Sequence, residues 1–269
     1  MPSHCGEHET APVRSKLLTS FEMAFLSFKD VLYRRGALTV LNRVSFDLEA
    51  GETLVLLGRS GSGKTTALRL INRLLEPESG TILFDGEDIQ HVDPILLRRK
   101  IGYVIQEIGL LPHWTVGQNI ALVPTIAGWE PGKRDERARE LLSQVGLPPD
   151  EYLRRYPRAL SGGQRQRVGV ARALAASPAL LLFDEPFGAL DPVTRREMQL
   201  QFLALRDRYQ TPSVFVTHDV AEALTLASRI AVLDAGNLET IATPDDFRNV
   251  STPVARSFLD TLTPLDKVH

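Results

Sequence analysis

Short, continuous apolar runs alternate with longer amphipathic stretches along most of this chain. The runs cover residues 54–57, 101–105, 180–183, 214–216 and 230–233. A short run without polar alternation is typical of a strand that is buried on both faces of a parallel sheet. The amphipathic stretches between the runs have helical spacing and would cover those faces. The pattern therefore predicts an α/β fold built on a mostly parallel sheet.

The hydrophobic pattern changes in two places. Residues 25–28 and 44–48 precede the first buried run and predict an antiparallel β flank at the N-terminal side. Strand signals disappear between about 107 and 177, where residues 133–145, 151–156 and 166–176 have helical spacing. We therefore expect a helical subdomain inserted into the sheet domain, and a short helical tail after a last strand at 237–242.

The two ends of the chain are expected to lie outside the folded domain. Residues 1–22 are polar and have neither an apolar core nor a cleavage-like site, so they predict a disordered extension rather than a secretion signal. Met23 is an alternative start of the protein. We expect an ordered domain at 23–249 and a short C-terminal tail at 250–269.

Composition narrows the class of partner. Of the 269 residues, 43% are hydrophobic, and 31 Lys and Arg face 33 Asp and Glu, for a net charge of −2. This balance predicts no polyanion-binding face, so nucleic acid is not an expected partner. Cys5 is the single cysteine, which excludes an intrachain disulfide. No apolar stretch approaches the roughly 18 residues of a membrane span, so any transmembrane path would come from other chains.

A phosphate-binding loop follows the first buried run. Residues 58–65 read Gly-Arg-Ser-Gly-Ser-Gly-Lys-Thr and match G-x-x-x-x-G-K-[ST] between a strand and a helix. The competing interpretation is an ordinary glycine turn. Backbone amides of such a loop cradle phosphates, Lys64 would reach the β and γ oxygens, and Thr65 would offer a hydroxyl to magnesium. The expected nucleotide-binding residues here are Gly58, Arg59, Ser60, Gly61, Ser62, Gly63, Lys64, Thr65 and Thr66.

A pair of carboxylates follows another buried run. Asp184 and Glu185 end the apolar stretch at 180–183, on the side of a parallel sheet where sites usually lie. Asp184 would hold magnesium, and Glu185 would polarise the water that attacks the γ-phosphate. Taken alone, this stretch favours a simple turn, and the phosphate loop is what favours the catalytic interpretation.

The stretch Leu160-Ser161-Gly162-Gly163-Gln164 resembles the signature of ATP-binding cassette (ABC) transporter ATPases. The resemblance runs from about residue 25 to 258. It implies a P-loop NTPase with the ABC-cassette fold: a RecA-like, mostly parallel sheet core, an antiparallel β flank and a helical signature subdomain. It also implies a head-to-tail dimer, most simply a homodimer, in which the signature of one cassette closes over the ATP bound by the other.

The same resemblance assigns roles to three further residues. Gln106 resembles the glutamine that senses the attacking water and magnesium, and His218 resembles the switch histidine at the γ-phosphate. Asp191 resembles the residue that crosses the dimer interface, and it also fits an ordinary helix N-cap before residues 193–209. An isolated Gln or His would not indicate these roles. The order of these residues relative to the other motifs is what indicates them. Magnesium would then be held by Thr65, Gln106 and Asp184.

The adenine-stacking position departs from the family pattern. The aromatic residue expected there falls at Arg35, and Tyr33 lies two residues earlier. A guanidinium plane can stack on a base, and a short slip would bring Tyr33 into place. The third interpretation is that neither side chain touches the nucleotide.

Resemblance is the only guide to the transported solute. Several segments resemble the ATPases of importers for glycine betaine, choline, carnitine and related quaternary amines; they are residues 71–74, 98–106, 108–114, 119–124, 168–170 and 187–193. The chain ends at His269 without room for the regulatory CBS modules of many such ATPases, so osmotic gating by such modules is not expected. The alternatives are another ABC importer, for a lipid or an amino acid, and a soluble ABC ATPase without a transport role.

The resemblance also implies partners and a location. The expected partners are a second ATPase subunit, integral-membrane permease subunits and, through the permease, a substrate-binding protein. The expected location is the cytoplasmic face of the inner membrane, as a peripheral subunit. The soluble ABC alternative is disfavoured because the chain has neither a long coiled-coil insertion nor a second cassette.

Overall fold

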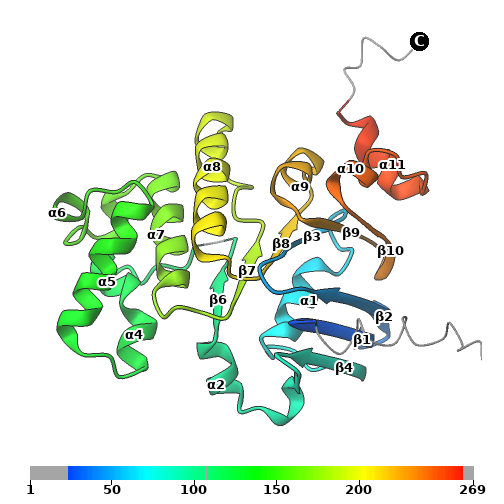
Figure 1. The fold of residues 1–269 in the computed structure, drawn as a ribbon, viewed down its shortest axis with the longest axis horizontal. Coiled ribbons are helices and arrows are strands. Elements are labelled where there is room, and N and C mark those ends of the chain that lie inside the picture. Colours follow the sequence, from blue (N-terminus) through cyan, green and yellow to red (C-terminus); the bar gives the residue numbers. More distant parts are fainter. Residues whose placement is uncertain (1–23, 107, 263–269) are drawn as a thin grey trace, which may run out of the picture.

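A computed structural model of the protein describes residues 24–106 and 108–262. The expected N-terminal extension, the alternative start at Met23 and the last residues of the tail lie outside this range. Within it, the elements form a sheet domain and a helical lobe that projects from one side (Figure 1). None of the helices in the described part of the chain is both long and apolar enough to cross a bilayer.

The centre of the molecule is a six-stranded sheet with the order β10-β9-β3-β8-β7-β6. Its inner pairs are parallel, and β10 runs antiparallel at one edge. Every residue of β3, β7 and β8 is buried, which explains their continuous apolar runs. The strands are β3 (Thr53–Leu57), β6 (Ile101–Val104), β7 (Leu180–Asp184), β8 (Ser213–Thr217), β9 (Arg229–Asp234) and β10 (Asn237–Ala242).

The expected β flank is a second, antiparallel sheet of four strands, β2-β1-β4-β5. The stretches predicted at 25–28 and 44–48 are parts of longer strands, because exposed polar residues and register shifts after Phe28 mask the alternation. Phe28 and Phe46 stack across the first pair, with ring centroids 4.3 Å apart. The strands are β1 (Leu26–Arg35), β2 (Leu38–Leu48), β4 (Ser79–Phe84) and β5 (Glu87–Asp88).

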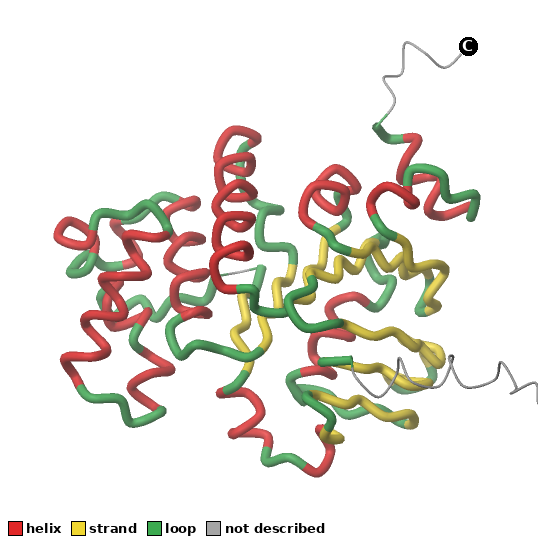
Figure 2. Tube along the Cα trace, viewed as in Figure 1, coloured by secondary structure: helices red, strands yellow, loops and turns green. Residues whose placement is uncertain are grey.

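The helical lobe lies where strand signals disappear from the sequence, and Figure 2 shows only helices and loops there. Its helices begin earlier than predicted, because prolines occupy the first turns of α5 and α6 and Ser161 caps α7. The predicted helix at 151–156 is wrong in extent, since α6 ends at Tyr152. The lobe contains α3 (Val116–Ile120), α4 (Leu122–Ile126), α5 (Pro131–Gln144), α6 (Pro149–Tyr152), the 3-10 turn η2 (Pro157–Ala159) and α7 (Gly162–Leu174).

The remaining helices cover the sheets and complete the tail. Asp191 caps the long helix α8, as the sequence predicts, and Asp219 caps α9. These elements are α1 (Lys64–Ile71), the 3-10 turn η1 (Ile89–His91), α2 (Pro94–Arg99), α8 (Pro192–Tyr209), α9 (Val220–Leu226), α10 (Pro244–Phe247) and α11 (Pro253–Asp260).

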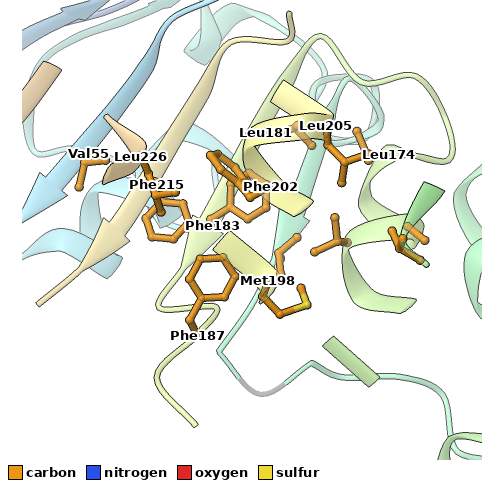
Figure 3. Close-up of a cluster of buried hydrophobic side chains, with 14 of the residues drawn as sticks. Val55, Leu174, Leu181, Phe183, Phe187, Met198, Phe202, Leu205, Phe215 and Leu226 are labelled. Carbon is orange, nitrogen blue, oxygen red and sulfur yellow. The ribbon is translucent and has the colours of Figure 1, made fainter. Parts of the chain in front are cut away.

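An aromatic cluster fixes the end of β7, where the two carboxylates lie. Figure 3 shows Phe183, Phe187, Phe202 and Phe215 gathered around one buried space, with Met198 beside them. The rings of Phe183 and Phe215 stack at 5.6 Å, and Phe202 meets Phe183 edge-on at 5.1 Å. Truncating one such ring to alanine costs about 3–5 kcal/mol, so this core holds the backbone that precedes Asp184 and Glu185.

Candidate active site

The phosphate loop connects β3 to α1 and depends on glycine at two close approaches. A Cβ atom at Gly58 would lie 2.3 Å from the carbonyl oxygen of Leu233, and one at Gly63 would lie 2.8 Å from that of Val40. Gly63 also has a φ of 104°, in the left-handed region. Only glycine fits these positions, so the loop can pass close to the neighbouring strands and start α1 with its amides directed outward.

Lys64 lies inside the curl of this loop. Its side chain is 4% exposed, and its Nζ donates hydrogen bonds to the carbonyl oxygens of Gly58 (2.7 Å) and Arg59 (2.8 Å). Burial lowers the pKa of Lys64, and the charges of Glu185 and Asp184 oppose that shift. The loop therefore holds one ammonium group at its centre, next to two carboxylates.

Asp184 is the best candidate to hold a metal ion. It is 7% exposed, and its Oδ1 accepts a hydrogen bond from Thr65 Oγ1 at 2.8 Å. Its Oδ2 accepts a second bond from the hydroxyl of Tyr103 at 3.2 Å. Burial, followed by the charge of Asp184, raises the pKa of Tyr103, so the phenol stays protonated and remains a donor.

The donor set around Asp184 fits magnesium. The Asp184 carboxylate and the Thr65 hydroxyl lie in hydrogen-bond contact and both offer oxygen, and Gln106, which lines the same cleft as Thr65, offers a side-chain amide oxygen. No cluster of three or more His, Cys, Asp or Glu side chains suited to a metal lies within residues 24–106 and 108–262. A Mg²⁺ ion usually keeps several waters and binds through one or two carboxylates together with substrate phosphates, and Asp184 beside the phosphate loop can supply such a carboxylate.

Glu185 and His218 form the second polar pair of the site. His218 Nδ1 lies 3.0 Å from Glu185 Oε2, and the His218 side chain is 58% exposed. Glu185 has a φ of 44°, which costs a residue with a Cβ about 1–2 kcal/mol. Its amide donates to the carbonyl oxygen of Val216 on β8, which holds the strained backbone in place. The fold thus tolerates strain at the residue predicted to act on water.

The turn that carries His218 is anchored by a buried acid. Glu222 is 4% exposed, and its Oε2 accepts a hydrogen bond from Thr217 Oγ1 at 2.7 Å. Thr217 Oγ1 in turn accepts from the amide of Asp219 at 3.0 Å. Burial raises the pKa of Glu222, and the Thr217 hydrogen bond opposes that shift. Thr217 is therefore fixed to α9 through Glu222, and Asp219, on the other side of His218, is fixed to Thr217.

A cleft brings most of the predicted residues together. Its volume of about 660 Å³ falls within the roughly 300–1,000 Å³ of small-molecule pockets. Gln106 and Glu185 line it together with the phosphate loop, and both candidates for adenine stacking, Tyr33 and Arg35, line it as well. The full lining is Tyr33, Arg35, Leu38, Val40, Ser60, Gly61, Gly63, Lys64, Thr65, Thr66, Arg69, Leu75, Gln106 and Glu185.

The signature residues lie elsewhere, at the start of α7 in the helical lobe. Ser161 Oγ accepts from the amide of Gln164, and Gln164 Oε1 accepts from the amide of Ser161, which forms a capping box. Ser161 and Gly162 are exposed. Among the residues that line the cleft there is none from Ser161 to Gln164. One chain therefore does not bring its signature to its own phosphate loop.

Asp191 is also outside the cleft. Its Oδ1 accepts from the amides of Val193 (3.1 Å) and Thr194 (3.0 Å) at the start of α8. Hydrogen bonds from Thr194, and then from Val193, lower the pKa of Asp191. The N-cap interpretation of this residue is correct, and a role across a dimer interface stays a prediction.

Sequence reasoning missed several residues of the site. Tyr103 binds the predicted Asp184, Glu222 binds Thr217 next to the predicted His218, and Leu38 and Arg69 line the cleft. Tyr103 shares the strand before Gln106, but the sequence does not say that β6 pairs with β7. Glu222 gives the ordinary signal of an acid in the first turn of a helix, so its burial was not predictable.

Comparisons with known proteins agree with this geometry. The family described as ABC transporter matches residues 41–188. The chain is 53% identical over 226 residues to the glycine betaine/carnitine/choline transport ATP-binding protein OpuCA of Bacillus subtilis (strain 168), which is 84% of this chain and 59% of OpuCA. It is 49% identical over 214 residues to the glycine betaine uptake system ATP-binding protein YehX of Escherichia coli (strain K12), which is 79% of this chain and 69% of YehX.

A solved structure gives the same answer for the fold. The dimeric post-hydrolysis state of the ATP-binding cassette MJ0796, bound to ADP and Pi, superposes with a TM-score of 0.73 and 32% sequence identity. The match covers 81% of this chain and 98% of that one. The fold predicted from the sequence is therefore confirmed, and the chain belongs to the ABC transporter family.

Proposed function

We propose that this chain is the ATP-hydrolysing subunit of an importer for quaternary amines such as glycine betaine, choline or carnitine. The observation that carries the ATPase assignment is that the phosphate loop, Gln106 and Glu185 line one cleft, where Thr65 of the loop also binds Asp184. The names of OpuCA and YehX support the solute class. The matched part of the chain spans only 59% of the length of OpuCA. Both the ATPase activity and the solute are therefore proposals, and the experiment below tests them.

In this proposal the phosphate loop binds the triphosphate of ATP. The amides at residues 60–66 and the Lys64 ammonium surround the β and γ phosphates. Thr65, Asp184 and Gln106 hold Mg²⁺, which neutralises charge that develops on the phosphate oxygens. Adenine and ribose extend toward β1, where Tyr33 and Arg35 line the cleft.

Hydrolysis is assigned to Glu185, with His218 as its neighbour. Glu185 accepts a proton from a water molecule, the water oxygen bonds to the γ-phosphorus, and the bond to the bridging oxygen of ADP breaks. His218, 3.0 Å from Glu185, would orient that carboxylate and face the γ-phosphate. Lys64 stabilises the negative charge on the transferred group. The products are ADP and inorganic phosphate.

The site is completed by a second copy of the chain. Ser161, Gly162, Gly163 and Gln164 lie away from the cleft and on an exposed helix start, so they are free to close over ATP held by another subunit. Asp191 would meet the opposite site across the same interface. The dimeric MJ0796 cassette supports this arrangement.

The remaining partners follow from the importer role. Permease subunits would supply the transmembrane path and would bring this subunit to the cytoplasmic face of the inner membrane. A substrate-binding protein would deliver the solute to the permease. Closure of the ATPase dimer on ATP would turn the permease outward, and hydrolysis would reopen it.

Uptake by cells that carry the whole transporter tests both parts of the proposal. Radiolabelled glycine betaine, choline and carnitine are compared between the native chain and Glu185→Gln, which removes a general base worth about 10²–10⁴-fold in rate. Native uptake of one of these solutes, lost in the variant, is the expected result. ATPase activity without uptake of any of them would contradict the solute class and favour a lipid or amino-acid importer. Absence of ATPase activity in the purified native chain would contradict the enzyme assignment.

A further inference from the structure

Tyr103 lies on β6, beside the strand that ends in Asp184. Strands β6 and β7 are parallel, with the Cα of Tyr103 opposite that of Leu182. The ring is half-buried and packs against the hydrophobic core around α1, while the hydroxyl reaches Asp184 Oδ2 at 3.2 Å. The side chain therefore has an apolar body fixed by packing and a polar tip directed at the predicted magnesium ligand.

This contact divides the Asp184 carboxylate between two donors. Thr65 binds Oδ1 from the first turn of α1, and Tyr103 binds Oδ2 from the neighbouring strand. With Asp184 only 7% exposed, little solvent is available to replace either partner. A carboxylate held at both oxygens cannot rotate freely about its last bond, so its orientation toward the phosphate loop is fixed before a ligand arrives.

We propose that Tyr103 is a positioning residue for the magnesium that accompanies ATP, and that it acts by orienting Asp184. The inference rests on the proposed ATPase function and extends it to a residue that has no contact with nucleotide in that scheme. Partners that orient a metal ligand typically change metal affinity about 10–100-fold. Since Tyr103 supplies one neutral hydroxyl, we expect the lower end, roughly tenfold.

Tyr103→Phe is the cleanest variant, because it removes the hydroxyl and keeps the packed ring. Tyr209→Phe is the matched control. Tyr209 is also half-buried and its hydroxyl is also hydrogen-bonded, to Gln144 Oε1 at 2.5 Å, but it lies on α8 and is not among the residues that line the cleft. Both variants are made in the Glu185→Gln background, so that ATP is not hydrolysed during the measurement.

The experiment measures ATP affinity twice for each protein, by equilibrium dialysis with radiolabelled ATP in EDTA and again in saturating Mg²⁺. The ratio of the two dissociation constants is the coupling between metal and nucleotide, and it does not depend on turnover. Tyr103→Phe should lower this ratio about tenfold and leave the affinity in EDTA unchanged. Tyr209→Phe should leave the ratio at the value of the parent.

Three results would overturn the inference. An unchanged ratio in Tyr103→Phe would show that the hydroxyl does not position the metal ligand. An equal loss of affinity with and without Mg²⁺ would indicate a general role in nucleotide binding or folding instead. If the Glu185→Gln parent bound no ATP, the proposed function would fail first and the inference with it, so the two failures are distinguishable.

Discussion

The phosphate loop and the signature loop are both glycine-rich starts of helices, yet the structure treats them in opposite ways. The phosphate loop curls around a buried Lys64, binds Asp184 through Thr65 and shares a cleft with Glu185. The signature at Ser161 is exposed and satisfies its own first amides with a capping box. The phosphate loop is part of a site within one chain, whereas the signature loop is a stable surface that a second chain can meet.

This contrast between the two loops explains why one chain forms only half of the proposed site. A loop that closes over the ATP of another subunit must also be stable before that nucleotide is near. The capping box of Ser161 and Gln164 provides this stability within the helical lobe. The phosphate loop needs neighbours from several strands, since its glycines touch Val40 and Leu233. Changes in the two loops should therefore have separable effects, and the predictions below test this.

The largest effect is expected from Lys64→Ala. Hydrogen bonds to charged groups are worth about 1.5–3 kcal/mol, and Lys64 would make them to the phosphates, so ATP affinity should fall on the order of a hundredfold. Isothermal titration calorimetry measures the affinity. Lys133→Ala is the control, because Lys133 is exposed and lies over Trp129 on the helical lobe. Retained affinity in Lys64→Ala would remove this residue from the site.

Ser161→Ala should separate dimer closure from nucleotide binding. It removes a helix cap, which costs about 1 kcal/mol of stability, and it removes a hydroxyl that would meet the partner's ATP. Thr115→Ala is the matched control, since Thr115 and Gln118 form a second capping box in the same lobe. Both variants should lose similar stability in urea, but only Ser161→Ala should lose hydrolysis, by about tenfold, with ATP affinity of the monomer unchanged. Equal activity in the two variants would contradict the role of the signature.

Arg35→Ala should have a smaller effect on ATP affinity, of about two- to fivefold, because exposed stacking of a cation on a ring is worth about 0.5–1 kcal/mol. Arg34→Ala is the control. Arg34 follows Tyr33 on the same strand, pairs with Glu78 at 2.9 Å and does not line the cleft. A dissociation constant that does not change in Arg35→Ala would exclude this residue and leave two interpretations, stacking on Tyr33 or contact with neither side chain.

The smallest effect is a pH dependence from Glu222. Because burial raises its pKa above the ordinary 4.5, the folded chain binds this proton more tightly than the unfolded chain. The resulting stabilisation is complete below about pH 4.5 and is lost as the pH rises through the raised pKa. The native chain should therefore lose stability relative to Glu222→Gln between acidic and neutral pH in urea titrations. A difference in the free energy of unfolding between the native chain and Glu222→Gln that stays constant with pH would contradict this prediction. Glu136→Gln is the control, because Glu136 is exposed and its substitution should cause no such pH dependence.

The sequence predicted best those features that follow directly on buried strands. The loop after β3, the carboxylates after β7 and His218 after β8 all stand next to continuous apolar runs, so their place at one sheet edge was readable. The sheet could be predicted for the same reason. The ATP-binding and dimer roles of these residues remain proposals that the experiments above address.

The sequence did not predict contacts between elements that are distant along the chain. The bond from Tyr103 to Asp184 depends on which strands are neighbours, and the bond from Thr217 to Glu222 depends on how deeply α9 is buried. The full length of the hairpin of β1 and β2 was also missed, because its exposed polar face hides the alternation beyond 25–28 and 44–48. That hairpin places Leu38 and Val40 at the cleft, so the missed strand residues are the ones near the expected adenine site.

The most direct test of the account is the mass of Glu185→Gln with and without MgATP, measured by light scattering after size exclusion. Without nucleotide, the expected mass is the 29.8 kDa of one chain. With MgATP, the expected mass is twice that value, because each signature closes over the ATP of the other chain. Adding Ser161→Ala to this variant should return the mass toward one chain while ATP remains bound. A Glu185→Gln protein that binds MgATP and keeps the mass of one chain would contradict the central claim.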